Sequence, residues 1–223
     1  MICQPILAFL HTSPVHIPTF ENLTQAQAPH TPTLHRVEEN LLAQARAEGI
    51  TPALETQVQR VLLELVAQGA TVIVCTCSTL GASAETAQVG CPVLRVDRAM
   101  AQKALLLGEE ILIVAALAST LEPTRNLFLE VANSTDQKTE QNAEQKVELL
   151  ELWCQNAWTK FEAGDKIGYL QEIAQEITRG VIQHPRVDVV VLAQASMIGA
   201  EKYCPEVQIP ILSSPLLGVQ AAL

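Results

Sequence analysis

The 223-residue chain has few basic residues, few aromatic residues and no long apolar run. It carries 14 Lys and Arg against 24 Asp and Glu, a formal net charge of −10 at pH 7. Binding to nucleic-acid phosphates requires clustered basic side chains, so this balance argues against a nucleic-acid-binding protein. The most apolar stretch, residues 104–117, contains Glu109 and Glu110 and is shorter than the ~20 residues that cross a bilayer. We therefore expect no membrane span.

Cysteine pairs with metal-ligand spacing are also scarce. Only Cys75 and Cys77 lie close together, and no second Cys or His pair completes a metal set. Six unevenly spaced cysteines do not indicate a disulfide framework. The N-terminus lacks the basic region that precedes the apolar core of a secretory signal. We expect a cytoplasmic protein that holds no metal.

What the sequence does contain is typical of an α/β protein. Six short apolar runs predict strands buried on both faces of a parallel sheet: Ile6–Leu10, Thr71–Cys75, Val93–Val96, Ile111–Ala115, Asp188–Leu192 and Ile209–Leu212. Four stretches between them have a helical pattern: Val37–Glu48, Leu54–Gln68, Lys146–Glu162 and Ile167–Gln183. Strands that alternate with helices predict parallel sheets flanked by helices.

Two polar stretches interrupt this alternation. Thr24–Thr33 is a predicted loop, and Asn133–Gln145 is either a solvated loop or the exposed start of the next helix. Trp153 and Trp158 are expected on one helix, where they would serve packing or a dimer surface. Asp97 and Arg98 are expected as a surface or lobe-contact pair.

An internal duplication is visible in the order of the motifs. A shift of 117 residues places residues 72–80 on 189–197, and shifts of 105 and 118 match Ile6-Leu7 and Pro92-Val93-Leu94 with similar apolar segments. These matches occur in the same order with similar offsets. They predict two similar α/β lobes.

We place the lobes at residues 1–104 and 105–223, with a segment or two exchanged between them, because no linker separates the halves. In parallel α/β sheets, ligands bind beyond the carboxyl ends of the strands. Two lobes related by a pseudo-twofold axis would bring equivalent strand ends face to face. We therefore expect a ligand cleft between the lobes.

The clearest chemical signal is the run Val74–Gly81, VCTCSTLG, where a buried strand enters a polar turn before a predicted helix start near Ser83. Cys77 lies at the exit of the strand, close to backbone N–H groups that lower a thiol pKa from ~8.5. Ser78 and Thr79 offer hydroxyls and amides to a carboxylate. The alternative is a small, buried and unreactive cysteine pair.

This run resembles the first active-site cysteine motif of the aspartate/glutamate racemase superfamily, which includes hydantoin racemases, maleate isomerases and arylmalonate decarboxylases. The similarity continues through HTSP at 11–14, STLEPT at 119–124, LAQAS at 192–196 and IPILSSP at 209–215. The resemblance implies two pseudo-symmetric α/β lobes, a site between them, a small carboxylate substrate and no cofactor. Racemases of this superfamily place one cysteine from each lobe on opposite faces of the substrate. Homodimers are common among them, so a homodimer is an expectation here as well.

The second lobe departs from this pattern. A Gly-Cys-Thr-like turn is implied there, but the chain has Gln194 at the position that the 117-residue shift pairs with Cys77. An amide donates and accepts hydrogen bonds but does not transfer protons near pH 7. Three alternatives stay open: one-base chemistry such as decarboxylation or tautomerisation, covalent addition of the Cys77 thiolate to a conjugated double bond, and carboxylate binding without catalysis. Cys204 lies beyond a predicted helix start and is not a substitute.

Further candidates follow the ends of the other strands. His11 is a candidate general acid or base, because its unperturbed pKa is ~6.5, and a loop-bracing role is the alternative. Thr12 and Ser13, next to it, are candidate substrate-binding residues. His16 is a second suspect for proton transfer. His30 and His35 are expected at the surface.

The second lobe supplies its own candidate binding residues. Ser119 and Thr120 resemble the turn with which the family holds a substrate carboxylate, although Ser119 and Thr124 could equally cap a helix through Leu127–Ala132. Ala195 and Ser196 follow Gln194, and Ser196 corresponds to Thr79. A helix N-terminus at either place would favour negative charge.

We therefore expect a cofactor-independent, isomerase-like enzyme that acts on a small carboxylate through a single thiol, Cys77. A decarboxylase-like lyase and a non-catalytic carboxylate-binding protein on a racemase scaffold are the alternatives.

Overall fold

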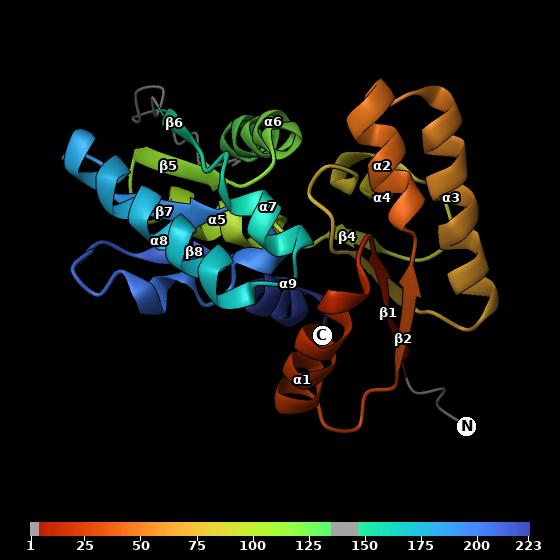
Figure 1. Ribbon diagram of the computed structural model, residues 1–223. Helices are drawn as coiled ribbons and strands as arrows, with labels where there is room; N and C mark the ends of the chain where they lie inside the picture. The colour runs from red at the N-terminus through yellow and green to blue at the C-terminus, as the bar shows by residue number, and fades with distance from the viewer. Residues whose placement is uncertain (1–4, 135–146) are drawn as a thin grey trace, which may run out of the picture. The chain divides into compact units, whose positions relative to one another are not determined.

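The computed structural model describes residues 5–134 and 147–223, which form two compact units (Figure 1). Unit 1 extends to Asp97 and also includes Pro215–Leu223, and unit 2 is Arg98–Ser214. The boundary expected between residues 104 and 105 falls inside helix α5 (Arg98–Leu105). The segment that returns to unit 1 belongs to the C-terminal helix α9 (Ser214–Ala222).

Each unit contains a four-stranded parallel sheet, and the two sheets have equivalent strand orders, β2-β1-β3-β4 and β6-β5-β7-β8. The strands are β1 (Leu7–His11), β2 (Thr33–Val37), β3 (Val72–Cys75), β4 (Val93–Arg95), β5 (Glu110–Ala115), β6 (Glu148–Trp153), β7 (Val189–Leu192) and β8 (Ile211–Ser213). The six predicted strands are all present. The expected class, parallel α/β sheets flanked by helices, is confirmed.

Helices cover both faces of the sheet in unit 1. On one face, α2 (Glu39–Glu48), α3 (Pro52–Ala67) and α4 (Gly81–Thr86) pack on the alternate side chains of β1 and β3. On the other face lies α1 (Ile17–Gln27), where the Phe20 and Phe9 rings are 5.2 Å apart. Burying both faces stabilises a parallel sheet, because its strands are apolar on both sides.

Unit 2 repeats this arrangement with its own helices. Helices α7 (Ala157–Glu162) and α8 (Lys166–Gln183) pack on one side of the sheet, and α6 (Ala118–Ser134) contacts β5 and β6. Short 3₁₀ helices follow β1 at Pro14–His16 and β7 at Ala195–Met197, and a third lies at Ala200–Tyr203. Among the helices of the described residues, none has the length and apolar character needed to cross a bilayer.

The sequence analysis misses two of the four edge strands, β2 and β6. The expected loop Thr24–Thr33 contains the end of α1 and the first residue of β2, and the expected helix Lys146–Glu162 contains β6 followed by α7. These two strands are only partly buried, so they lack the continuous apolar run that marks β1 or β5. Trp153 and Trp158 therefore lie on different elements. The predicted polar segment Asn133–Gln145 lies, from residue 135 onward, outside the described residues.

The duplication extends to individual hydrogen bonds. After β3, Leu80 N donates to Cys77 O at 3.2 Å, and after β7, Met197 N donates to Gln194 O at 3.0 Å. Cys77 and Gln194 therefore hold equivalent places in their own units, as the 117-residue shift predicts.

The first strands of the two units correspond at a shift of 104 residues, one less than the predicted 105. Glu38 N donates to His11 O at 2.8 Å in unit 1, and Cys154 N donates to Ala115 O at 2.8 Å in unit 2. His11 thus corresponds to Ala115, and the residues that follow them, Thr12 and Ala116, correspond as well.

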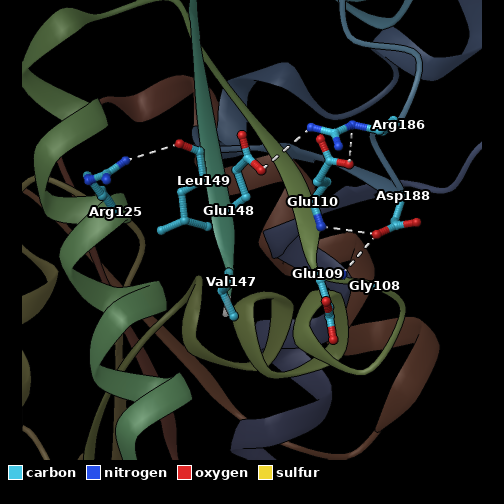
Figure 2. Close-up of a pocket in the computed structure, with 9 residues that line it drawn as sticks. All are labelled: Gly108, Glu109, Glu110, Arg125, Val147, Glu148, Leu149, Arg186 and Asp188. Carbon is cyan, nitrogen blue, oxygen red and sulfur yellow. Dashed lines mark hydrogen bonds and ion pairs between the residues drawn. The ribbon is translucent and has the colours of Figure 1, made fainter. Parts of the chain in front are cut away.

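At the amino ends of the strands, a side-chain oxygen joins neighbouring strands in both units. Ile6 N donates to Thr71 Oγ1 at 2.8 Å, and Glu110 N donates to Asp188 Oδ2 at 3.0 Å. The backbone N–H groups of Glu110 and Glu109 donate to Asp188 and hold the pKa of its carboxyl below its usual range. Asp188 lines a pocket of about 780 Å³ together with Glu110 and Glu148, at the amino ends of β5 and β6 (Figure 2).

Strand β4 ends beside a buried ion pair. Arg95 and Asp97 are 3% and 0% exposed, and two hydrogen bonds of 2.7 and 3.1 Å join the guanidinium to the carboxylate. Of the two places expected for Asp97, the surface and a lobe contact, the surface is therefore wrong. Arg98 pairs instead with Glu130 at 2.9 Å on the surface of unit 2. A Cβ atom at Gly81 would lie 2.9 Å from Arg95 Nε, so the guanidinium packs tightly on the start of α4.

The Asp97→Ala substitution should lower the free energy of unfolding by about 3–5 kcal/mol, because it leaves the Arg95 charge buried without its carboxylate. The matched control, Glu130→Ala, removes an exposed ion pair and should cost at most about 1 kcal/mol. Urea unfolding measures both. Equal losses would contradict the importance of the buried pair.

Candidate active site

Cys77 lies in the turn between β3 and α4, and its thiol is almost enclosed. The residue is 8% exposed. The sulfur accepts hydrogen bonds from the hydroxyls of Thr12 and Thr79 and from the backbone N–H groups of Thr79 and Leu80. These donors favour the thiolate, but burial outweighs them and raises the pKa of Cys77. The predicted lowering of this pKa is therefore wrong, because loss of solvation penalises the charged form more than the donors stabilise it.

Cys75, at the end of β3, is fully buried in the same apolar cluster as Cys77. Its thiol lies 3.6 Å from Cys77 O and donates to it, and burial raises its pKa strongly. This environment fits a core residue. Of the two thiols, Cys77 alone contacts the polar residues of the strand ends.

Ser78 and Thr79 lie in this turn, and Ser13 follows β1. Ser78 and Thr79 are buried, at 5% and 7% exposed, and Ser13 precedes the first 3₁₀ helix. The structure thus brings Thr12, Ser78 and Thr79 to the carboxyl end of the unit 1 sheet together with Cys77. This is the edge at which parallel α/β sheets bind ligands.

In unit 2, the backbone orients the amide of Gln194. Its Oε1 accepts hydrogen bonds from Ala116 N at 2.7 Å and Leu117 N at 3.0 Å. Two such converging N–H groups form a concavity that favours negative charge. In the described part of the chain, Nε2 of Gln194 has no hydrogen-bond partner. The side chain thus fills the concavity with its own oxygen and presents its NH₂ group as a donor.

Trp153 is a site residue that the sequence analysis misses. Its indole Nε1 donates to Ala116 O at 3.3 Å, and the residue is 48% exposed. Trp153 therefore hydrogen-bonds to the carbonyl oxygen of Ala116, and Gln194 hydrogen-bonds to the N–H group of the same residue. Nothing in residues 148–153 alone separates a strand from a helix, and only their pairing with β5 brings the indole to this edge of the sheet.

The remaining candidates of unit 2 lie either after β7 or at the start of α6. Ala195 is 5% exposed, and Ser196 Oγ lies 2.8 Å from the hydroxyl of Tyr169, whose pKa burial raises strongly. Ser119 and Thr120 lie in the first turn of α6, because this helix begins at Ala118. The helix runs through Leu127–Ala132 as expected, but it begins before both of its predicted caps, Ser119 and Thr124.

The first turn of α6 has the features of an anion site. Thr120 is 2% exposed, and Ser119 Oγ is buried without a partner in the described residues. The first N–H groups of a helix attract negative charge. Thr124, the alternative cap, lies inside the helix.

Three histidines gather at the carboxyl end of β1. His11 is fully buried, its Nδ1 lies 2.9 Å from Thr76 Oγ1, and its Nε2 lies 3.0 Å from His35 Nδ1. The rings of His11 and His16 are 6.2 Å apart. The surface position predicted for His35 is therefore wrong, because it lies on β2 and stacks on His11. His30 is exposed, as predicted.

Burial lowers the pKa of all three histidines. It lowers the pKa of His11 to about 3, with further contributions from His16 and His35, and it lowers the pKa of His16 to about 4. It also lowers the pKa of His35, although the charge of Glu21 opposes this shift. Residues 5–134 and 147–223 contain no group of three His, Cys, Asp or Glu side chains arranged to hold a metal ion.

The free energy of unfolding should fall as the pH is lowered from about 6.5 to 5. Unfolded His11 and His16, with an ordinary pKa of ~6.5, bind protons in this window, whereas the folded protein does not. Each histidine should contribute a slope of ~1.4 kcal/mol per pH unit once its unfolded form is protonated. Urea unfolding at several pH values gives the slope. His30→Leu should leave it unchanged, His11→Leu should reduce it, and a flat profile would contradict the neutral state of these histidines.

Two α/β units with equivalent strand orders, and polar side chains beyond equivalent strand ends, define a duplicated α/β protein. The family model of the Asp/Glu/Hydantoin racemases matches residues 12–222. The chain therefore belongs to the Asp/Glu/hydantoin racemase family. Among curated proteins, no sequence matches this chain significantly.

Solved structures share the fold at low sequence identity. Aspartate racemase from Picrophilus torridus is 15% identical with a TM-score of 0.65, covering 98% of this chain and 94% of that chain. Allantoin racemase from Klebsiella pneumoniae is 18% identical with a TM-score of 0.65, covering 98% and 86%. A mutant of arylmalonate decarboxylase in a sulfate-associated form is 16% identical with a TM-score of 0.62, covering 98% and 91%.

That Cys77 and Gln194 face each other across a cleft stays a prediction of the duplication. In a Gln194→Cys variant, a short reagent with two thiol-reactive ends should link Cys77 to the new cysteine, because both would contact one small substrate. The matched control is Gln208→Cys, at an exposed position of the same unit. Peptide mapping identifies the link. Equal linking in the control, or none in Gln194→Cys, would refute the arrangement.

Proposed function

We propose that this chain is an isomerase-like enzyme that needs no cofactor and acts on a small carboxylate through one thiol, Cys77. The observation that carries the proposal is the hydrogen bonding of Gln194. Its oxygen is bound to Ala116 N and Leu117 N, so its NH₂ group is a fixed donor. A fixed donor can stabilise developing negative charge on an oxygen, but it cannot supply a second proton-transfer step.

The two units would therefore have different roles. The Cys77 thiolate would remove a proton from the carbon next to the carboxylate, and the resulting thiol would return it to another atom of the delocalised anion, which completes a tautomerisation. The enediolate oxygens would accept hydrogen bonds from Gln194 and from the hydroxyls and amides of the binding residues. For that binding we propose Thr12, Ser13, Ser78 and Thr79 of unit 1, and Ser119, Thr120, Ala195 and Ser196 of unit 2.

The raised pKa of Cys77 favours the thiol, so the thiolate that removes a proton is the minor form before substrate binds. Burial raises this pKa in the absence of substrate, and the hydroxyl and amide donors around the sulfur oppose that effect. Proton transfer is efficient when the pKa of the catalytic group is not far from the working pH. We assign no proton transfer to His11, because both of its ring nitrogens hydrogen-bond within unit 1.

A decarboxylase-like lyase is the second candidate, and the same observation favours it. Loss of CO₂ from a malonate leaves an enediolate, which needs a donor for its charge and one proton on carbon. Gln194 would supply the first and the Cys77 thiol the second. The solved structures of this fold include an arylmalonate decarboxylase.

The test is incubation of amino, hydroxy and substituted malonic acids with the protein in D₂O, followed by NMR and chiral analysis. We expect deuterium at the α-carbon without inversion, or CO₂ release from a malonate. Cys77→Ser should reduce the rate by ~10²–10⁴-fold. The matched control Cys91→Ser, at a partly buried cysteine, should leave it unchanged.

Two outcomes would overturn the proposal. Rapid inversion by the unmodified protein would mean that a second residue transfers protons. Carboxylate binding without exchange or CO₂ release on any of these acids would favour a binding protein.

A further inference from the structure

A continuous hydrogen-bond chain runs from the end of β1 to β2. Thr76 Oγ1 donates its single proton to Leu10 O at 3.1 Å, so it must accept the bond from His11 Nδ1 at 2.9 Å. A neutral imidazole carries one N–H group, so His11 Nε2 is the acceptor of the 3.0 Å bond from His35 Nδ1. Counting protons thus assigns one tautomer, Nδ1–H, to both histidines.

The chain ends at His35 Nε2, an unprotonated nitrogen that is buried without a partner in the described residues. The titratable groups that face these rings are His16, in the 3₁₀ helix after β1, and Glu21 on α1. The Phe9 and Phe20 rings fill the remaining space. A proton on His11 Nε2 would point at the N–H group of His35 and be repelled by it. The hydrogen-bond chain therefore requires a neutral His11.

The hydrogen-bond chain involves the residues that immediately precede Thr12 and Cys77, which contact each other. Thr12 follows His11, and Cys77 follows Thr76. Successive side chains of a strand point to opposite faces, and Cys77 belongs to the apolar cluster that covers the face opposite to His11. The His11–Thr76 bond therefore joins the same two strand ends that carry Thr12 and Cys77.

The duplication provides an internal comparison. In unit 2, the positions equivalent to His11 and Thr76 hold Ala115 and Ala193, and the position equivalent to His35 holds Glu151. The strand pairing is the same in both units, so the fold itself does not need the histidines. Among the described residues, the hydrogen-bond chain is present in the unit that holds Cys77, and its counterpart is missing from the unit that holds Gln194.

We propose that His11 and His35 are positioning residues, which hold Thr76 and thereby keep the Cys77 turn against Thr12. The inference rests on the proposed function, because it takes Cys77 to be the reactive thiol. Neither histidine contacts substrate in this role.

The first test is the protonation state of the rings. Long-range ¹H–¹⁵N correlation spectra of the labelled full chain at pH 7 should show Nδ1–H and an unprotonated Nε2 for both His11 and His35. The Nε2–H form of either ring would overturn the proposal. This measurement uses the unsubstituted protein, so it decides the matter even if a variant fails to fold.

The second test compares two substitutions of one residue. His35→Leu removes the donor, whereas in His35→Asn the amide N–H takes the place of Nδ1–H. Amide hydrogen exchange in the segment 75–80 should be about five- to tenfold faster in His35→Leu, as expected for loss of one buried hydrogen bond, and within about twofold of the unsubstituted protein in His35→Asn. His30→Leu, at an exposed histidine, is the control.

Equal exchange in the Leu and Asn variants would overturn the positioning role, because a general packing defect would affect both. Both tests are made without substrate. A failure of the proposed chemistry would therefore appear in the D₂O assay with Cys77→Ser, and it would leave the ring tautomers and the exchange rates unchanged.

Discussion

The structure depends on one interaction that occurs once in each unit, the hydrogen bond that joins the ends of the two central strands. Thr76 N donates to Leu10 O at 3.0 Å, and Ala193 N donates to Val114 O at 2.9 Å. In a parallel sheet these bonds fix the register of neighbouring strands. They therefore decide which residues emerge at the carboxyl edge. Because the register is the same in both units, Cys77 and Gln194 leave their sheets at the same point.

On this common frame the two units differ in chemistry. The sulfur of Cys77 sits among hydrogen-bond donors and can carry or release a proton, although burial favours its neutral form. In unit 2 the backbone donors of Ala116 and Leu117 are already occupied by the Gln194 oxygen. One sheet edge thus offers a titratable atom, and the other offers a donor that is neutral at every working pH. This asymmetry is the main argument for chemistry at a single thiol.

The parts that the sequence predicts are those with local signals. Buried central strands such as β5 are continuous apolar runs, and the offset between Cys77 and Gln194 follows from repeated motifs. The misses depend on contacts between distant residues. His35 becomes half-buried only because β2 pairs with β1, Trp153 reaches Ala116 only because β6 pairs with β5, and Asp97 is buried only because the Arg95 guanidinium neutralises it.

The return of α9 to unit 1 has a consequence for the synthesis of the chain. Gly218 packs so closely on the end of β4 that a Cβ atom there would lie 2.7 Å from Val96 O. Chains fold from the N-terminus as they emerge from the ribosome, but residues 215–223 emerge only after all of unit 2. The unit that carries Cys77 is thus begun before unit 2 and completed after it, so a nascent chain holds its thiol in an unfinished unit until unit 2 has been made.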